Sequence, residues 1–162
     1  HGKRPWSSLG ETSVRAHTPV GKRAAQTGGK ASVIGLRRED KNKWERRAPL
    51  APRHVDELVK QGLKVVVQPC TRRVFTDVEY LDAGAEIKED LSECSTILAV
   101  KEVPPELLLP GRTWCFFSHT IKAQPSGMPL LDAALQKKVR LLDYECITGT
   151  GARGGPRLVA FG

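Results

Sequence analysis

The chain has 162 residues, 40% hydrophobic and 27% charged, which is enough for one folded domain and ordinary for a globular protein. No apolar run approaches the ~20 residues that span a bilayer, so we expect no membrane partner. The net charge of +8 suggests nucleic acid, but residues 1–32 hold six Lys/Arg against one acid and the rest hold 20 against 17. Because most of the excess lies in a tail, and no nucleic-acid-binding motif is present, we expect no nucleic acid partner.

The first 32 residues lack hydrophobic periodicity and are rich in Gly, Ser, Thr, Lys and Arg. This pattern predicts a disordered leader. An Arg-rich, acid-poor leader is also typical of a mitochondrial transit peptide, which favours the mitochondrial matrix over the cytoplasm. The chain starts with His1 rather than Met, so a non-native leader is the alternative.

From residue 33 onward, apolar runs alternate with helical patterns. In chain order we predict a strand at 33–36, a helix at 52–61, a strand at 64–68, a helix at 77–83, a strand at 96–100, a helical turn at 104–109, a strand at 114–118, a helix at 128–138, a strand at 140–143, a loop at 149–156 and a last apolar run at 157–161. In the second helix Asp77 is the expected cap, and in the third Leu131, Leu135 and Val139 form the expected core stripe.

This alternation predicts an α/β, Rossmann-like fold with a mostly parallel sheet and helices on both faces. The strands are continuous apolar runs, as expected when both faces are covered. No strand is followed by G-x-G-x-x-G, so the dinucleotide fingerprint is lacking. The four cysteines are separated by 24, 21 and 31 residues, which is neither a zinc spacing nor a small disulfide framework. We therefore expect no metal, and reduced thiols.

Three polar clusters follow predicted strands, and parallel strands gather such loops at one edge of the sheet. The first runs from Arg38 to Arg47, where a guanidinium fork suits a carboxylate. The second begins at Lys101, a strand-end lysine suited to proton transfer. The third holds His119 and Lys122, and histidine titrates near neutral pH. Taken singly, each cluster has a plain alternative: solvated or internally paired arginines, a surface lysine paired with Glu102, and a structural histidine.

Longer motifs carry a family resemblance. The segments are Arg38-Glu-Asp followed by Trp44-Glu-Arg-Arg-Ala-Pro-Leu-Ala-Pro52, Ala99-Val-Lys-Glu102, Phe116-Phe-Ser-His-Thr-Ile-Lys-Ala-Gln124 and Arg140-Leu-Leu-Asp-Tyr-Glu145. They resemble the lysine–ketoglutarate reductase part of the bifunctional α-aminoadipic semialdehyde synthases. More broadly, the chain is similar to the N-terminal domain shared by saccharopine dehydrogenases, alanine dehydrogenase and nicotinamide nucleotide transhydrogenase. The stretch 148–156 departs from the short acidic hairpin usual in that family.

The resemblance implies condensation of lysine with 2-oxoglutarate and reduction of the imine by NADPH, giving saccharopine in lysine degradation. By the family pattern, Lys101 and His119 resemble an acid–base pair. Arg47 resembles the arginine that holds a substrate carboxylate, with Lys122 a second candidate for that role and Arg38 a weaker one.

In the family a second domain carries the nucleotide site, and this chain ends at Gly162 before such a segment. We therefore expect residues 33–162 to be a substrate-side domain that binds NADPH weakly or not at all and is inactive alone. Its expected partners are the missing nucleotide-binding and saccharopine dehydrogenase domains, and an oligomer is left open. The alternatives are a non-catalytic amino-acid-binding or interaction module and half of a biosynthetic saccharopine dehydrogenase.

Overall fold

The computed structural model describes residues 32–149 and 155–159, which form a six-stranded sheet with every pair of neighbouring strands parallel. The strands and α-helices are β1 (Val33–Leu36), α1 (Pro52–Lys60), β2 (Lys64–Val67), α2 (Asp77–Asp82), β3 (Glu86–Ile87), β4 (Thr96–Leu98), β5 (Thr113–Phe116), α3 (Met128–Gln136) and β6 (Arg140–Asp143). Short 3₁₀ turns lie at η1 (Pro105–Leu107), η2 (Thr120–Lys122), η3 (Pro125–Gly127) and η4 (Tyr144–Cys146). The predicted α/β fold with a parallel sheet is confirmed.

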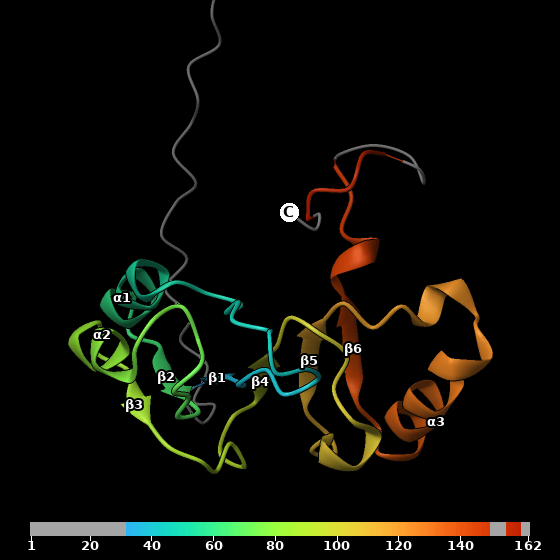
Figure 1. The fold of residues 1–162 in the computed structure, drawn as a ribbon, viewed down its shortest axis with the longest axis horizontal. Helices are drawn as coiled ribbons and strands as arrows, with labels where there is room; N and C mark the ends of the chain where they lie inside the picture. The colour runs from blue at the N-terminus through green and yellow to red at the C-terminus, as the bar shows by residue number, and fades with distance from the viewer. Residues whose placement is uncertain (1–31, 150–154, 160–162) are drawn as a thin grey trace, which may run out of the picture.

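Helices cover both faces of the sheet (Figure 1). On one face α1 and α2 bury Val55 and Tyr80 against β1 and β2. On the other face α3 packs Leu130 near Trp114 and Phe116 of β5. Successive residues of β2 point to opposite faces and are buried on both, which explains why the strands read as unbroken apolar runs.

The predicted cap of α2 is wrong by one residue. Thr76, not Asp77, is the N-cap: its hydroxyl accepts the Glu79 N–H, while the Glu79 carboxylate accepts the Thr76 N–H. This reciprocal pair satisfies two amides that a helix start leaves open. Gly84 follows the helix with φ +84°, a left-handed conformation that suits glycine.

The predicted core stripe of α3 is confirmed at Val139, which packs against the core cluster, but is wrong at Leu135. Leu130 and Ala134 are the buried residues of the helix, whereas Leu135 is 70% exposed. Ala133 packs against the same core cluster as Leu130 and Ala134. Small side chains let the helix lie close to the sheet, so the alanine side of α3 faces inward.

Several predictions were incomplete, and two fall outside the described residues. The strand β3 was missed because it has only two residues, and the predicted strands at 64–68, 96–100 and 114–118 end earlier than expected. The predicted leader at 1–32 lies outside the described residues except for Ser32, and so do residues 150–154 and 160–162 of the last loop and apolar run. Arg157 forms a single antiparallel bridge with Thr148.

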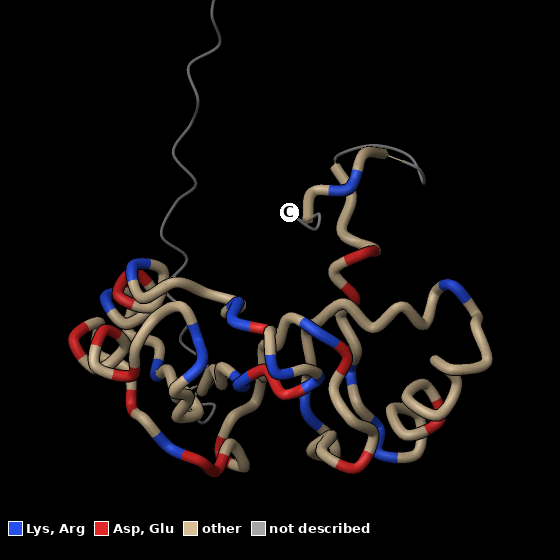
Figure 2. The backbone as a smooth tube through the Cα atoms, viewed as in Figure 1, with Lys and Arg blue, Asp and Glu red and all other residues tan. Residues whose placement is uncertain are grey.

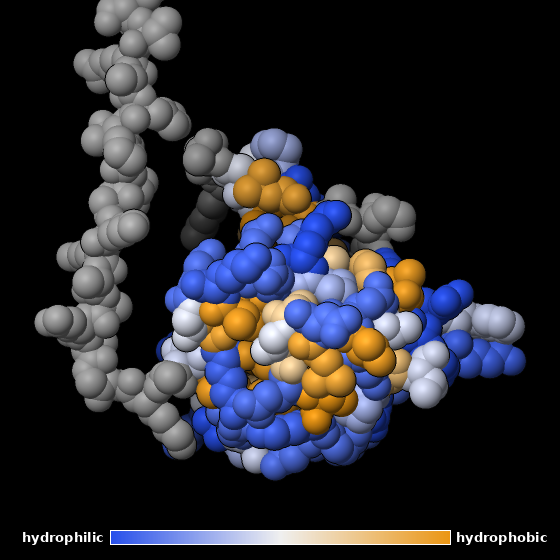
Figure 3. All heavy atoms as spheres, turned by 90° about the vertical axis from the view of Figure 1, so that its left-hand side faces the viewer, coloured by the Kyte–Doolittle hydropathy of each residue, from blue (hydrophilic) through white to orange (hydrophobic). Residues whose placement is uncertain are grey.

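The surface of the described part is mixed in charge and hydropathy. Basic and acidic positions alternate along the backbone rather than forming one basic face (Figure 2). The side that carries α1 and α2 is mostly hydrophilic with scattered apolar residues (Figure 3), and Val74, Val78 and Leu81 are among the exposed ones. Within the described residues, the longest helices are too short to cross a membrane.

Candidate active site

The carboxyl ends of the strands define one edge of the sheet, and the sheet order is β3-β2-β1-β4-β5-β6. The chain moves outward from β1 through β2 to β3, then returns to β4 on the other side of β1. Such a reversal opens a crevice between neighbouring loops at the carboxyl ends, where open α/β folds bind ligands. The loops that follow β1, β4, β5 and β6 therefore surround the candidate site.

The β5 loop carries His119, which interacts directly with the β6 side of the edge. The ring Nδ1 lies 2.8 Å from the Glu145 carboxylate, whose side chain is only 3% exposed. An ionised carboxylate accepts hydrogen bonds only, so His119 donates from Nδ1 in this contact, and Glu145 thereby orients the ring. His119 has a left-handed backbone, with φ 57°. Single residues in this strained region are enriched at functional sites.

Glu145 contacts three basic side chains. Besides His119, Lys122 Nζ lies 3.5 Å away and Arg157 Nη1 lies 3.4 Å away from its carboxylate. Burial acts to raise the pKa of Glu145, but the hydrogen bond and charge of His119, together with Lys122, outweigh it and hold the pKa below its usual value. Two permanent cations, Lys122 and Arg157, face this single buried carboxylate, and the resulting positive charge suits an anionic ligand.

The β4 loop adds Lys101 and Glu102. The Glu102 carboxylate contacts the Lys41 ammonium and lies 3.7 Å from Nε2 of His119. Burial, followed by the charge of Lys101, lowers the pKa of Lys41. The β1, β4 and β5 loops are thus linked through Lys41, Glu102 and His119.

These side chains line a hollow of about 440 Å³ at the carboxyl edge. Its polar lining includes Lys41, Glu102, His119 and Lys122, and Pro104 and Leu130 contribute apolar walls. A hollow of this size with few, convergent polar groups is typical of a small-molecule site.

Arg47 lies on the same loop as Lys41 but lines a separate, shallow hollow with Trp44, Glu45, Arg46 and Val74. Its guanidinium donates to both Glu45 oxygens, at 2.8 and 2.7 Å. This hydrogen bonding, with a smaller contribution from the charge of Lys101, lowers the pKa of Glu45 to about 2.

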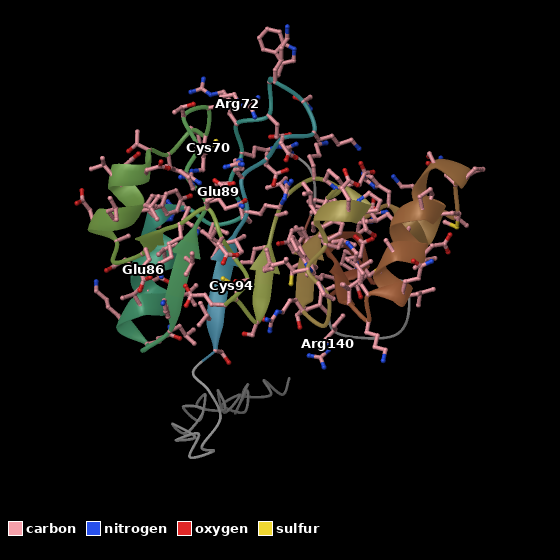
Figure 4. All side chains as sticks on the ribbon, turned by 90° about the horizontal axis from the view of Figure 1, so that it is seen from below. Cys70, Arg72, Glu86, Glu89, Cys94 and Arg140 are labelled. Atoms are coloured by element: carbon pink, nitrogen blue, oxygen red, sulfur yellow. The ribbon has the colours of Figure 1, made fainter. Side chains whose placement is uncertain are left out.

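Arg38 does not line the hollow that contains His119 and Lys122. Its guanidinium binds both oxygens of Glu89, and it lines a hollow of about 220 Å³ with Arg37 and Gln68. Figure 4 shows Glu89, with Cys70 and Arg72, toward the carboxyl ends of the strands, and Arg140 at the opposite edge. The structure thus brings His119 and Lys122 together at one hollow with Glu102, the chain neighbour of Lys101. Arg47 and Arg38 each line a different hollow.

Two acidic residues that were not predicted as site residues are central to this arrangement. Glu145 orients His119, and Glu102 links it to Lys41. Their positions in the sequence could have indicated this role, because each acid follows a strand of a parallel sheet, as the predicted lysine and histidine do. No group of three or more metal-ligating side chains is found among the residues that the structure describes.

The described residues do not fit the diphosphate of NADPH in the way a dinucleotide site requires. In such sites a glycine-rich turn follows the first strand and leads into a helix N-terminus. Here the connection between Gly35 and Gly62 contains no glycine, and Glu39 is buried within it. A buried carboxylate at that point opposes an anionic diphosphate.

Comparison with known proteins gives the family. Residues 35–161 match the family described as alanine dehydrogenase/PNT, N-terminal domain. This match spans most of the chain, so the chain belongs to that family. Two solved structures share the fold: an L-alanine dehydrogenase, with TM-score 0.63 and 23% identity over 73% of this chain and 34% of that one, and the Sinorhizobium meliloti transhydrogenase, with TM-score 0.63 and 17% identity over 75% and 37%.

Curated relatives are more similar in sequence. The chain is 53% identical over 131 residues to the mitochondrial alpha-aminoadipic semialdehyde synthase of Bos taurus, and 47% identical over 136 residues to the Arabidopsis thaliana alpha-aminoadipic semialdehyde synthase. It is 31% identical over 138 residues to the Emericella nidulans saccharopine dehydrogenase [NAD(+), L-lysine-forming]. These matches cover 80–82% of this chain but only 14%, 12% and 36% of those proteins.

Proposed function

We propose that this chain supplies the substrate-side domain of an NADPH-dependent reductase that condenses lysine with 2-oxoglutarate and yields saccharopine. The observation that carries the proposal is the convergence of His119, Lys122 and Glu102 on one hollow, with Lys101 next to Glu102 in the chain. The 53% identity to the bovine synthase supports lysine and 2-oxoglutarate as the substrates.

Carboxylates of the substrates are the groups that the cationic cluster suits best. Lys122 lies at the hollow, 3.1 Å from Nδ1 of His119, and provides an ammonium for one carboxylate. Arg47 is a second holder for a carboxylate that extends toward the neighbouring hollow, because its fork matches two oxygens. Arg38, bound to Glu89, is the weakest of the proposed holders.

Proton transfer is assigned to Lys101 and His119. The lysine substrate must lose an ammonium proton before its nitrogen attacks the keto carbon, and the resulting hydroxyl must gain a proton to leave as water. His119 is assigned the first transfer through Nε2, because Nδ1 contacts Glu145 and the ring is oriented by that contact. Lys101 is the proposed partner acid. We assign NADPH binding to a second domain, because the β1–α1 connection does not suit a diphosphate.

A chimeric enzyme tests this proposal. The matching segment of the bovine relative is replaced by residues 35–161 of this chain, and NADPH consumption is followed by its absorbance. We expect consumption only when lysine and 2-oxoglutarate are both present. Lys101→Gln lowers the rate by about a hundredfold or more. Lys60→Gln, a matched change at a 73% exposed lysine of α1, leaves the rate unchanged. A folded chimera that never consumes NADPH, or equal rates for the two variants, refutes the proposal and favours a non-catalytic module.

A second candidate is half of a saccharopine dehydrogenase of the NAD(+), L-lysine-forming type, favoured by the 31% identity to the Emericella nidulans enzyme. The chimera cannot separate the two, because its cofactor site belongs to the bovine protein. Extending the assay to the complete protein that carries this chain, with NADH and NADPH compared, separates them. We also propose the mitochondrion as the location, because the bovine relative is named as mitochondrial.

A further inference from the structure

The crevice between β1 and β4 is bridged by a buried carboxylate. In Figure 1 the cyan loop that follows β1 runs beside β4. The backbone pairing between these strands ends where Arg37 N–H donates to the Leu98 carbonyl at 2.9 Å. Beyond that point the side chain of Glu39 replaces the backbone acceptors. Its two oxygens accept the N–H groups of Val100 at 2.7 Å and Lys101 at 2.9 Å.

Burial and a hydrogen bond to its backbone fix the position of Glu39. It is only 4% exposed, and its backbone carbonyl accepts a hydrogen bond from Arg72 Nη2 at 3.2 Å. A buried carboxylate that accepts two adjacent amides restricts the peptide between them, because moving that peptide breaks both hydrogen bonds. The peptide fixed in this way is the one that leads into Lys101.

We propose that Glu39 is a positioning residue for Lys101: its carboxylate fixes the backbone of residues 100 and 101 across the crevice and so sets where the Lys101 ammonium stands. The charge of that ammonium acts on Lys41 and Glu45, both on the loop that contains Glu39. The inference rests on the proposed function for its catalytic meaning, whereas the geometric effect on Lys101 is testable without catalysis.

The first experiment observes Lys101 in the folded chain. Lysines are dimethylated with ¹³C formaldehyde, the Lys101 resonance is assigned by its loss in Lys101→Arg, and spectra of Glu39→Gln are compared with the parent. A glutamine side chain has one acceptor oxygen, so one amide loses its partner. We expect the Lys101 resonance to move and the amide of residue 100 or 101 to exchange faster with solvent. Glu57→Gln, the same charge change at an exposed site on α1, changes neither.

If Glu39 only stabilises the fold, the Lys101 resonance of folded Glu39→Gln has the same position as in the parent. That result overturns the proposal. If Glu39→Gln does not fold, Glu39→Asp takes its place: it keeps the charge but is one methylene too short to hold both amides. The same displacement of the Lys101 resonance is then expected, and its absence is equally decisive.

The second experiment places Glu39→Gln in the chimeric enzyme. Misplacing a catalytic group by about 1 Å costs up to ~10²-fold in rate, so we expect kcat to fall on the order of tenfold or more. The KM for 2-oxoglutarate changes little, because Lys122 is carried by another loop. An unchanged kcat overturns the proposal. A parent chimera without activity counts against the proposed function instead, and the lysine spectrum then decides the role of Glu39.

Discussion

Glu45 links the stability of the chain to pH through its contact with Arg47. Its carboxylate is 8% exposed and accepts three hydrogen bonds from Arg47, two from the guanidinium and one from the backbone N–H at 3.1 Å. The hydrogen bonding from Arg47 lowers the pKa of Glu45 from 4.5 to about 2. At ~1.4 kcal/mol per unit the full shift corresponds to about 3 kcal/mol. Because the Arg47 side chain is 41% exposed, solvent screening reduces this to about 1–2 kcal/mol.

The stability is expected to fall as the pH is lowered, because the pKa of Glu45 is lower in the folded state than in the unfolded one. The stabilisation is complete above the unfolded pKa near 4.5 and is lost as the pH falls toward about 2. Urea denaturation of the parent and of Glu45→Gln should therefore differ by about 1–2 kcal/mol at pH 7, and by less than half of that near pH 3. Glu57→Gln serves as the control. A Glu45→Gln difference that is the same at both pH values refutes the reasoning.

Three further predictions concern stability and are measured by urea or thermal denaturation. Gly35→Ala places a Cβ 3.0 Å from Sγ of Cys94 and costs about 1–3 kcal/mol, part of which Cys94→Ala recovers; full additivity of the two changes argues against a direct clash. Leu130→Ala costs about 2–5 kcal/mol, whereas Leu135→Ala costs less than about 0.5 kcal/mol; equal costs contradict the orientation of α3. Thr76→Ala removes the cap of α2 and costs about 1 kcal/mol, and no cost means that the cap is not formed in solution.

Much of the fold was predictable from the sequence because inner strands such as β2 are buried on both faces. Such strands read as continuous apolar, β-branched runs, and 64–67 is an example. Glycine marked the ends of helices correctly at Gly62 and Gly84, where φ is positive. The orientation of α3 was not predictable from hydropathy, because leucine outranks alanine on any such scale, whereas close approach to the sheet favours the smaller residue.

The position of the candidate site was predictable from the sequence, but the contacts between its acidic and basic side chains were not. A polar residue after a buried strand must reach the carboxyl edge, so Lys101 and His119 could be assigned to it. Which acid meets which base depends on contacts between residues far apart in the chain. The pairs Lys41 with Glu102 and His119 with Glu145 are of this kind, and local patterns do not encode them.

The most direct test of the account is a titration of the ¹⁵N-labelled chain with 2-oxoglutarate, followed by amide resonances. We expect saturable shifts at Glu102, His119 and Lys122, which line the hollow, and at the adjoining Lys101 and Glu145, with none at the β3 edge. Lys122→Gln should weaken the binding, and Lys60→Gln should not. Shifts confined to the hollow beside Arg38, or no saturable shifts at all, contradict the claim that the carboxyl edge around His119 binds the substrate.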